Sequence, residues 1–181
     1  MNKKQIKLAE KTLNLLSKKS WNFISVNEVL KGYKNLPKAI NNKNDLLRNI
    51  NRYVDHLLKI ETKSLDYSTQ KDMLFEVIML RFDILQKYRK SFIKLYDSFK
   101  FNPQKSLIFI PSFLESMLLS ADIAKINSNG LKGRMIIKGL FIIYIATFLV
   151  WIKDETKSLE KTMTALDKYL AHGNKIINGI I

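Results

Sequence analysis

Apolar residues recur at three- and four-residue spacing along most of this chain, and this spacing limits the folds open to it. The repeat places apolar side chains on one face of an α-helix, whereas a strand would alternate them at every second residue. No segment of the sequence shows a convincing alternation of that second kind. We therefore expect an all-α fold of about nine helices. The clearest repeat lies in residues 44–63 and consists of Leu46, Leu47, Ile50, Tyr53, Val54, Leu57 and Leu58.

Capping and helix-breaking residues indicate where several helices begin and end. Ser25, followed three residues later by Glu28, has the form of a capping box that opens a short helix over residues 26–31. Gly32 is expected to end that helix. Pro111 is expected to kink a later helix because proline lacks a backbone donor. Thr69 with Asp72 can start another helix, which includes the apolar run 74–82. The other predicted helices cover residues 3–18, 87–100, 104–126, 131–153 and 156–172.

Positive charge is concentrated in the first third of the chain. The whole sequence has 31 Lys+Arg against 16 Asp+Glu, a net charge of +15. Residues 1–60 hold 13 of the basic and 4 of the acidic residues (+9), and residues 61–181 hold 18 and 12 (+6). Such an excess at one end is typical of a surface that binds a polyanion, because each neutralised phosphate releases condensed counterion. Duplex nucleic acid and an anionic membrane surface both fit, as does an ordinary solvated surface in a lysine-rich chain.

The sequence offers little for catalysis, metal binding or cofactor binding. It has no Cys, which excludes disulfides, thiolate zinc sites and cysteine nucleophiles. Its two histidines, His56 and His172, lie far apart and have no partner at a metal-ligand spacing. Glu76 and Asp83 flank Arg81 on a predicted apolar helix, where a structural ion pair is the favoured interpretation. We expect neither an enzyme nor a resident cofactor or metal.

One uncharged run, residues 139–152, has to be compared with a membrane span. A span needs about 20 apolar residues, so this run is predicted to be a buried core or subunit-interface helix, with no transmembrane span. The N-terminus lacks the continuous apolar stretch of an export signal. Together with the absence of Cys, this predicts a cytoplasmic protein.

Residues 22–43 contain the parts of a helix-turn-helix in the right order: a short helix, a turn with glycine and a second short helix. In this interpretation residues 36–40 form the recognition helix, the lysines meet phosphates, and Tyr33 and Asn35 reach a phosphate or a base edge. The predicted partner is duplex DNA. The predicted DNA-binding residues are Ser25, Lys31, Tyr33, Lys34, Asn35, Lys38 and Lys43.

Several stretches carry a resemblance to one protein family. They are Ser-Val-Asn-Glu-Val at residues 25–29, Asn-Lys-Asn-Asp-Leu-Leu at 42–47, the apolar segment 74–83, and the segments 151–155 and 162–167. The second of these looks like the Ser-Lys-Glu-x-Leu-Leu that opens the fourth helix in the TetR family of bacterial regulators. On these residues the chain resembles TetR-like proteins over nearly its whole length.

The resemblance implies a three-helix DNA-binding head in residues 1–60 and a larger helical domain in residues 61–181 that binds ligand and dimerises. It also implies a phosphate contact by Lys43 and a homodimer formed through residues 131–153 and 156–172. An apolar small molecule or lipid would occupy the second domain. The residues expected to line its pocket are Phe75, Met79, Phe82, Phe109, Phe113, Met117 and Trp151.

The chain departs from the family pattern in its recognition helix, where Leu36 is followed by Pro37 and Ile40 stands in place of an aromatic residue. These departures favour an alternative. The second half also resembles the TetR-like lipid-binding proteins of mitochondrial ubiquinone biosynthesis, and in that case the DNA head would be vestigial. A helical scaffold with neither ligand nor DNA is the third possibility, since one fold hosts many functions.

Overall fold

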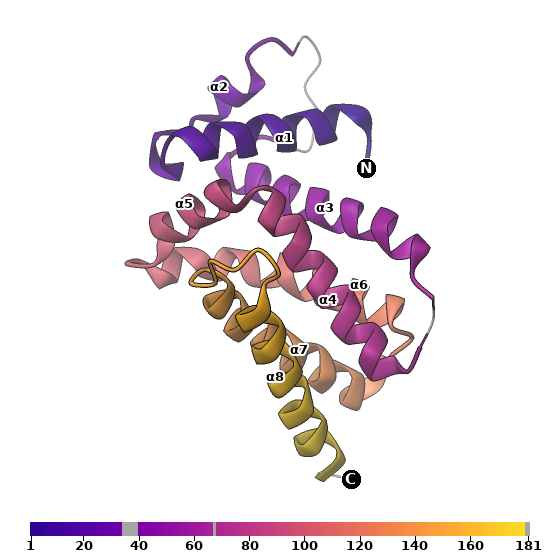
Figure 1. Ribbon diagram of the computed structural model, residues 1–181. Coiled ribbons are helices and arrows are strands. Elements are labelled where there is room, and N and C mark those ends of the chain that lie inside the picture. Colours follow the sequence, from indigo (N-terminus) through magenta and orange to yellow (C-terminus); the bar gives the residue numbers. More distant parts are fainter. Residues whose placement is uncertain (34–39, 67, 180–181) are drawn as a thin grey trace. The chain divides into compact units, whose positions relative to one another are not determined.

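The computed structural model describes residues 1–33, 40–66 and 68–179 of the 181-residue chain. Every regular element in these residues is helical, which confirms the all-α prediction (Figure 1). The described residues form eight α-helices and three short 3₁₀-helices (η). In chain order they are α1 (Lys3–Lys18), η1 (Trp21–Phe23), α2 (Val26–Leu30), α3 (Lys43–Glu61), η2 (Thr62–Ser64), α4 (Gln70–Lys87), α5 (Arg89–Phe99), η3 (Pro103–Phe109), α6 (Ile110–Ile123), α7 (Gly130–Trp151) and α8 (Glu160–Gly179).

The start of α2 follows the sequence prediction in part. The Ser25 hydroxyl accepts a 3.1 Å hydrogen bond from the backbone N–H of Glu28, as an N-cap residue does. The Glu28 carboxylate lies 2.6 Å from the Lys19 ammonium instead of completing a capping box. After α2, Gly32 has φ +94, a conformation that side chains with a Cβ rarely adopt. The predicted recognition helix over residues 36–40 lies almost wholly outside the described residues.

Two later helix boundaries differ from the prediction. Pro111 is the second residue of α6 and lies in its first turn, where a backbone donor has no intrahelical partner to lose, so it does not kink a longer helix. α8 begins at Glu160, four residues later than expected, and continues through Gly173 to Gly179. The late start has a local cause, the buried carboxylate of Asp154.

The Asp154 side chain is fully buried between the end of α7 and the start of α8. One of its oxygens accepts hydrogen bonds from the backbone N–H and hydroxyl of Thr156, at 3.1 and 2.6 Å. The other accepts from the N–H and hydroxyl of Thr162, both at 2.8 Å. The carboxylate therefore holds the residues before α8 in a loop and caps the first turn of that helix.

The chain divides into two compact units. Unit 1 comprises Met1–Ile60 and Ile84–Ser112, and unit 2 comprises Glu61–Asp83 and Phe113–Ile181. The sequence prediction of a head in residues 1–60 and a second domain in residues 61–181 did not include the second segment of unit 1. That segment carries α5, which packs along α1.

Buried side chains of α1, α3 and α5 hold unit 1 together. The Ser91 hydroxyl on α5 donates a buried 2.7 Å hydrogen bond to the Leu13 carbonyl oxygen on α1. The Tyr53 hydroxyl on α3 lies 2.9 Å from the Tyr88 hydroxyl and donates to the Glu10 carboxylate at 3.0 Å. The apolar core around them includes Leu8, Ala9, Leu13, Leu16, Trp21, Val29, Leu46 and Ile50.

The described residues contain two stretches that are long and apolar enough to cross a membrane, judged by length and composition alone. They are Ser106–Ile123, which begins within unit 1, and Gly130–Trp151, with mean hydropathies of 1.5 and 1.8. Core helices of soluble proteins pass the same test. Helix α7 is longer than the uncharged run of residues 139–152 that was compared with a membrane span.

Candidate functional site

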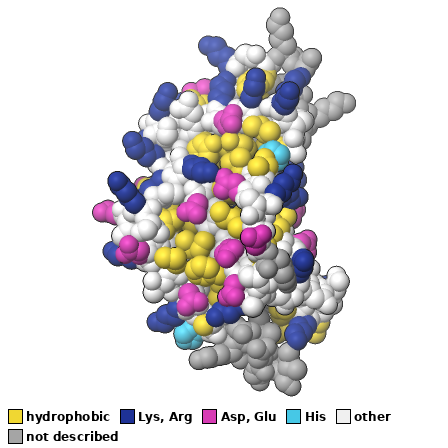
Figure 2. Space-filling view, turned by 45° about the vertical axis from the view of Figure 1, so that its right-hand side comes forward, with side chains coloured by type: hydrophobic (Ala, Val, Ile, Leu, Met, Phe, Trp, Pro, Cys, Tyr) yellow, Lys and Arg dark blue, Asp and Glu magenta, His cyan; other side chains and the backbone are white. Residues whose placement is uncertain are grey.

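Division of the chain into two units separates its charge far more sharply than the division at residue 60 does. Unit 1 holds 19 Lys+Arg and 5 Asp+Glu, a net charge of +14. Unit 2 holds 12 and 11, a net charge of +1. On the face drawn in Figure 2, Lys and Arg predominate in the upper part, whereas Asp and Glu gather among them in the lower part. Nearly the whole net charge of the protein therefore belongs to unit 1.

Helix α1 carries a continuous stripe of lysines, which we call the α1 lysine stripe. At 100° per residue its members fall within an arc of about 100° around the helix axis. The opposite side of α1 packs into the core of unit 1. Lys11 is half-buried and the others are exposed. The stripe consists of Lys3, Lys4, Lys7, Lys11 and Lys18.

Lys11 connects this stripe to the end of α2. Its ammonium donates a 2.8 Å hydrogen bond to the Lys31 carbonyl oxygen. It also lies 5.5 Å from the centre of the Tyr33 ring. Lys31 itself is exposed, so the stripe continues onto the turn that follows α2. One cationic surface thus joins α1 to the first half of the predicted helix-turn-helix.

The predicted DNA-binding residues differ in their exposure and in their contacts. Lys31 is exposed, Tyr33 is half-buried under Lys11, and the Ser25 hydroxyl caps α2. Lys43 is turned toward the interior of unit 1. The three others, Lys34, Asn35 and Lys38, lie outside the described residues.

Lys43 already has protein partners. Its ammonium donates to the carbonyl oxygens of Trp21 and Asn22, at 2.8 and 3.4 Å, and lies 4.9 Å from the centre of the Trp21 ring. Burial lowers the pKa of Lys43. Two of its three N–H donors are used in this way, so the ammonium has only one left for the expected phosphate contact.

The N-terminus of α3, where a phosphate was expected, is likewise occupied by protein groups. The Asp45 carboxylate accepts hydrogen bonds from the N–H groups of Asn41 and Asn42, at 2.9 and 3.2 Å. The Asn42 side chain accepts in return from the N–H of Asp45, at 3.0 Å. A carboxylate at this position neutralises the positive end of the helix dipole and repels phosphate. Other cations of unit 1 are exposed: most of the α1 lysine stripe, Lys31, and further ones on α3 and α5 such as Arg52, Lys59 and Lys90.

The residues predicted to bind an apolar ligand divide between the two units. Phe109 belongs to unit 1, where its ring packs 5.2 Å from that of Phe99 in an edge-to-face arrangement. In unit 2, Phe82, Met117 and Trp151 are fully buried core residues. The three other predicted residues, Phe75, Met79 and Phe113, are half-buried in unit 2.

An aromatic cluster with a buried cation forms the centre of unit 2. Phe82 stacks on Tyr144 at 5.4 Å between ring centres, and Trp151 lies 6.3 Å from Phe82. Arg81 is only 1% exposed, and its guanidinium lies 3.4 Å from the Tyr144 hydroxyl and 5.5 Å from the ring centre. Periodicity placed Arg81 on an apolar helix but did not reveal that Tyr144 would contact it.

The acidic and histidine residues considered in the sequence do not gather into a site. Glu76 and Asp83 are exposed, whereas Arg81 between them is buried. His172 lies within α8 and its ring contacts the Lys168 carbonyl oxygen at 2.6 Å. Among residues 1–33, 40–66 and 68–179, no three His, Asp or Glu side chains are arranged as metal ligands.

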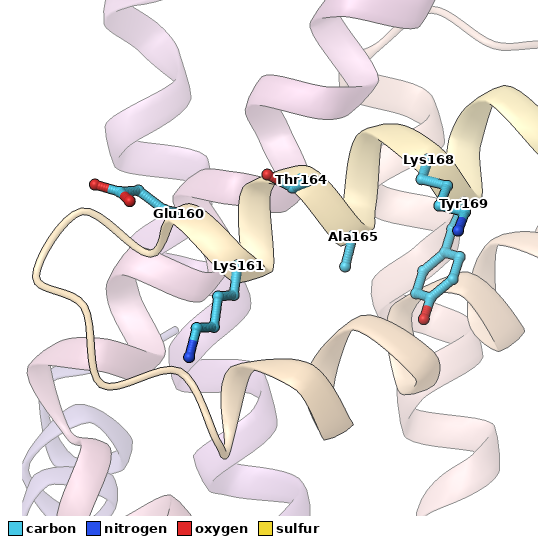
Figure 3. Close-up of a pocket in the computed structure, with 6 residues that line it drawn as sticks. All are labelled: Glu160, Lys161, Thr164, Ala165, Lys168 and Tyr169. Carbon is cyan, nitrogen blue, oxygen red and sulfur yellow. The ribbon is translucent and has the colours of Figure 1, made fainter.

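A shallow, open hollow of about 520 Å³ runs along α8 (Figure 3). Its lining is mixed in charge, and none of the predicted ligand-binding residues contributes to it. The hollow therefore does not correspond to the expected apolar pocket. Its lining residues are Glu160, Lys161, Thr164, Ala165, Lys168 and Tyr169.

Helix α7 exposes large apolar side chains along one side. Leu131, Met135, Ile142 and Leu149 are between 46% and 77% exposed. Their spacing places them near one another on the helix surface. α7 and α8 lie side by side in unit 2, and Met163 of α8 is exposed as well. An apolar side of this kind marks an interaction surface.

No protein-family model matches the chain, and a search of curated proteins finds no significant match.

Proposed function

We propose that this chain is a TetR-like transcriptional regulator that binds duplex DNA through unit 1 and an apolar ligand through unit 2. The separation of charge, +14 on unit 1 against +1 on unit 2, is the observation that carries the proposal. Cationic side chains on a small helical unit favour duplex binding by releasing counterions from the phosphates. The α1 lysine stripe, together with Lys31, supplies such cations next to the predicted helix-turn-helix.

The dimer and the ligand form the second half of the proposal. Two copies would associate through the exposed apolar side of α7, together with α8, so that two basic units meet two half-sites. The ligand would enter the aromatic cluster of unit 2 and shift the balance between DNA-binding and non-binding arrangements. Phe75 and Met79 precede Phe82 on α4, and Phe113 lies 6.0 Å from Tyr144 between ring centres. These three half-buried residues are the proposed first contacts.

The salt dependence of binding to generic duplex DNA tests the DNA-binding half of the proposal. Replacing Lys3, Lys7 and Lys18 together by Gln should reduce the slope of log K against log salt by about 0.9 for each lost phosphate contact. A matched variant carries Gln at three exposed lysines of unit 2, Lys132, Lys138 and Lys157. It removes the same charge and should leave the slope almost unchanged. Equal slopes for both variants and the unaltered protein would refute DNA binding through this surface.

A second candidate function is a lipid- or isoprenoid-binding helper protein with a vestigial DNA head. It is favoured by the inward placement of Lys43 and by Asp45 at the N-terminus of α3, which leave the expected phosphate contacts occupied. Solvent extraction of the purified protein, followed by mass spectrometry, tests it. If no apolar molecule co-purifies and added isoprenoid does not bind, the lipid-binding function is rejected.

A further inference from the structure

Four large apolar side chains of unit 1 are exposed to solvent in three neighbouring segments. Phe101 is 88% exposed, Phe23 76%, Leu107 59% and Ile108 39%. Phe23 ends η1, Phe101 follows α5, and the other two lie in η3. We call these four residues the unit 1 apolar patch. Exposed phenylalanine is costly in water, so a group of this size indicates a partner.

Direct contacts hold the three segments next to one another. The Ser98 hydroxyl near the end of α5 lies 3.0 Å from the Ser20 hydroxyl and accepts from the Trp21 N–H at 3.3 Å, which fixes η1 against α5. The backbone N–H of Asn102 donates to the Phe99 carbonyl oxygen at 2.9 Å. The Phe99 ring packs on Phe109, which fixes η3 against the same helix end.

The inward positions of these segments are already filled by other aromatic residues. Trp21 of η1 is 5% exposed, and Phe99 and Phe109 pack on each other against the core of unit 1. Phe23 and Phe101 therefore have no comparable place inside the unit. Phe23 and Phe101 are exposed because Trp21, Phe99 and Phe109 occupy the buried positions of these segments.

Cations accompany the patch. The Lys100 ammonium lies 5.0 Å from the centre of the Phe101 ring and 2.7 Å from the Asp97 carboxylate. The unit that bears the patch has 19 basic against 5 acidic residues. A surface with this charge attracts a polyanion and repels other basic surfaces, including those of its own copies.

We propose that unit 1 docks on an anionic lipid bilayer through this patch, with Phe101 and Leu107 entering the boundary of the acyl chains and Lys100 remaining among the lipid phosphates. Two observations favour a bilayer over DNA or a protein. Phosphate recognition gains nothing from exposed Phe and Leu side chains, whereas exposed apolar groups flanked by lysine match the interface of an anionic membrane. The net charge of +14 is complementary to such a membrane. The inference goes beyond the proposed regulator, which needs only the cations of unit 1.

Co-sedimentation of the full chain with vesicles tests the proposal. The probes are vesicles of phosphatidylcholine alone and vesicles of phosphatidylcholine with phosphatidylglycerol. We expect binding only to the second, with a partition coefficient that falls about ten-fold or more in the Phe101→Ser, Leu107→Ser double variant. Lys100→Gln should lower it about five-fold, because one lysine near the surface is lost.

A matched variant outside the patch, Ile60→Ser with Leu118→Ser, removes two other exposed apolar side chains and should bind vesicles like the unaltered protein. The two double variants change only exposed apolar residues, so their thermal unfolding and their DNA binding at low salt should stay unchanged. The proposal is overturned if Phe101→Ser, Leu107→Ser binds anionic vesicles normally, or if the matched variant loses binding equally. Conversion of a dimer to a monomer by the first variant would assign the patch to a second copy of the chain instead. Failure of the unaltered protein to bind duplex DNA would count against the proposed regulator and not against membrane docking.

Discussion

The Lys43 ammonium donates a 2.8 Å hydrogen bond to the Trp21 carbonyl oxygen and lies 4.9 Å from the centre of the Trp21 ring. The two residues come from α3 and η1, and their contact joins the segment before α2 to the start of the long helix after it. This lysine is the residue that the family resemblance assigned to a phosphate. Its geometry indicates a role in the stability of unit 1.

Replacing Lys43 by Met should therefore destabilise unit 1. The change removes a charge-assisted hydrogen bond and a cation–π contact, so we expect a loss of about 1–2 kcal/mol in the free energy of unfolding. Urea titration of Lys43→Met measures it. Lys59→Met, an exposed change on the same helix, is the control and should have little effect. A stable Lys43→Met protein with a reduced salt slope for DNA would restore Lys43 as a phosphate contact.

Acid should destabilise unit 2 through Asp154. Burial acts to raise the pKa of this carboxyl, but hydrogen bonds from Thr156 and Thr162 outweigh it and lower the pKa from 3.8 to about 2. The contribution to stability is present above pH 3.8 and is lost as the pH falls toward 2, because only the folded state disfavours the proton. It amounts to about 2 kcal/mol, which thermal melts of the full chain between these pH values would measure.

Asp154→Asn should remove that acid dependence and lower stability by about 2–4 kcal/mol at neutral pH, since buried donors lose their acceptor. Asp167→Asn, at an exposed position of α8, is the matched control and should leave both quantities nearly unchanged. An acid profile of Asp154→Asn identical to that of the unaltered chain would contradict the assignment.

Alkaline conditions should act on unit 1 through Tyr53. Burial, together with hydrogen bonds to Tyr88 and Glu10, raises the pKa of Tyr53 above its ordinary value of 10.0. Its contribution is thus complete below pH 10 and declines above it, where the unfolded tyrosine ionises first. Tyr53→Phe should cost about 1–2 kcal/mol at neutral pH and show a shallower decline above pH 10. Parallel declines in both proteins, measured by urea unfolding, would rule out this source.

The exposed side of α7 should be sensitive to charge if it forms the dimer. Ile142→Glu places a carboxylate where the partner would pack, and burying an unpaired charge costs several kcal/mol. We expect the dimer dissociation constant to rise about 100-fold or more. Light scattering after gel filtration would detect the resulting monomer. Ile60→Glu, an exposed position on α3 of unit 1, should keep the dimer, and a monomer in both variants would point to a different interface.

The positions of most helices and the basic character of the chain could be predicted from the sequence. The apolar period predicted α1, α3 and α7 within a few residues, because a helix with one buried face must repeat its apolar side chains at that period. Ser25 marked the start of α2, since its hydroxyl satisfies an end group that every helix leaves open. The excess of lysine was equally plain in the composition.

The partners of those helices were decided by tertiary structure. Periodicity shows which face of α5 is apolar but not which helix covers it, and the bond from Ser91 to Leu13 spans 78 residues. That packing brings Ile84–Ser112 into unit 1 and changes the charge division from +9 and +6 to +14 and +1. Tertiary contacts also turned Lys43 inward and left Phe101 outside. The sequence determines the type of a residue, such as lysine or phenylalanine. Whether that residue is buried or exposed depends on the space that its neighbours leave in the folded protein.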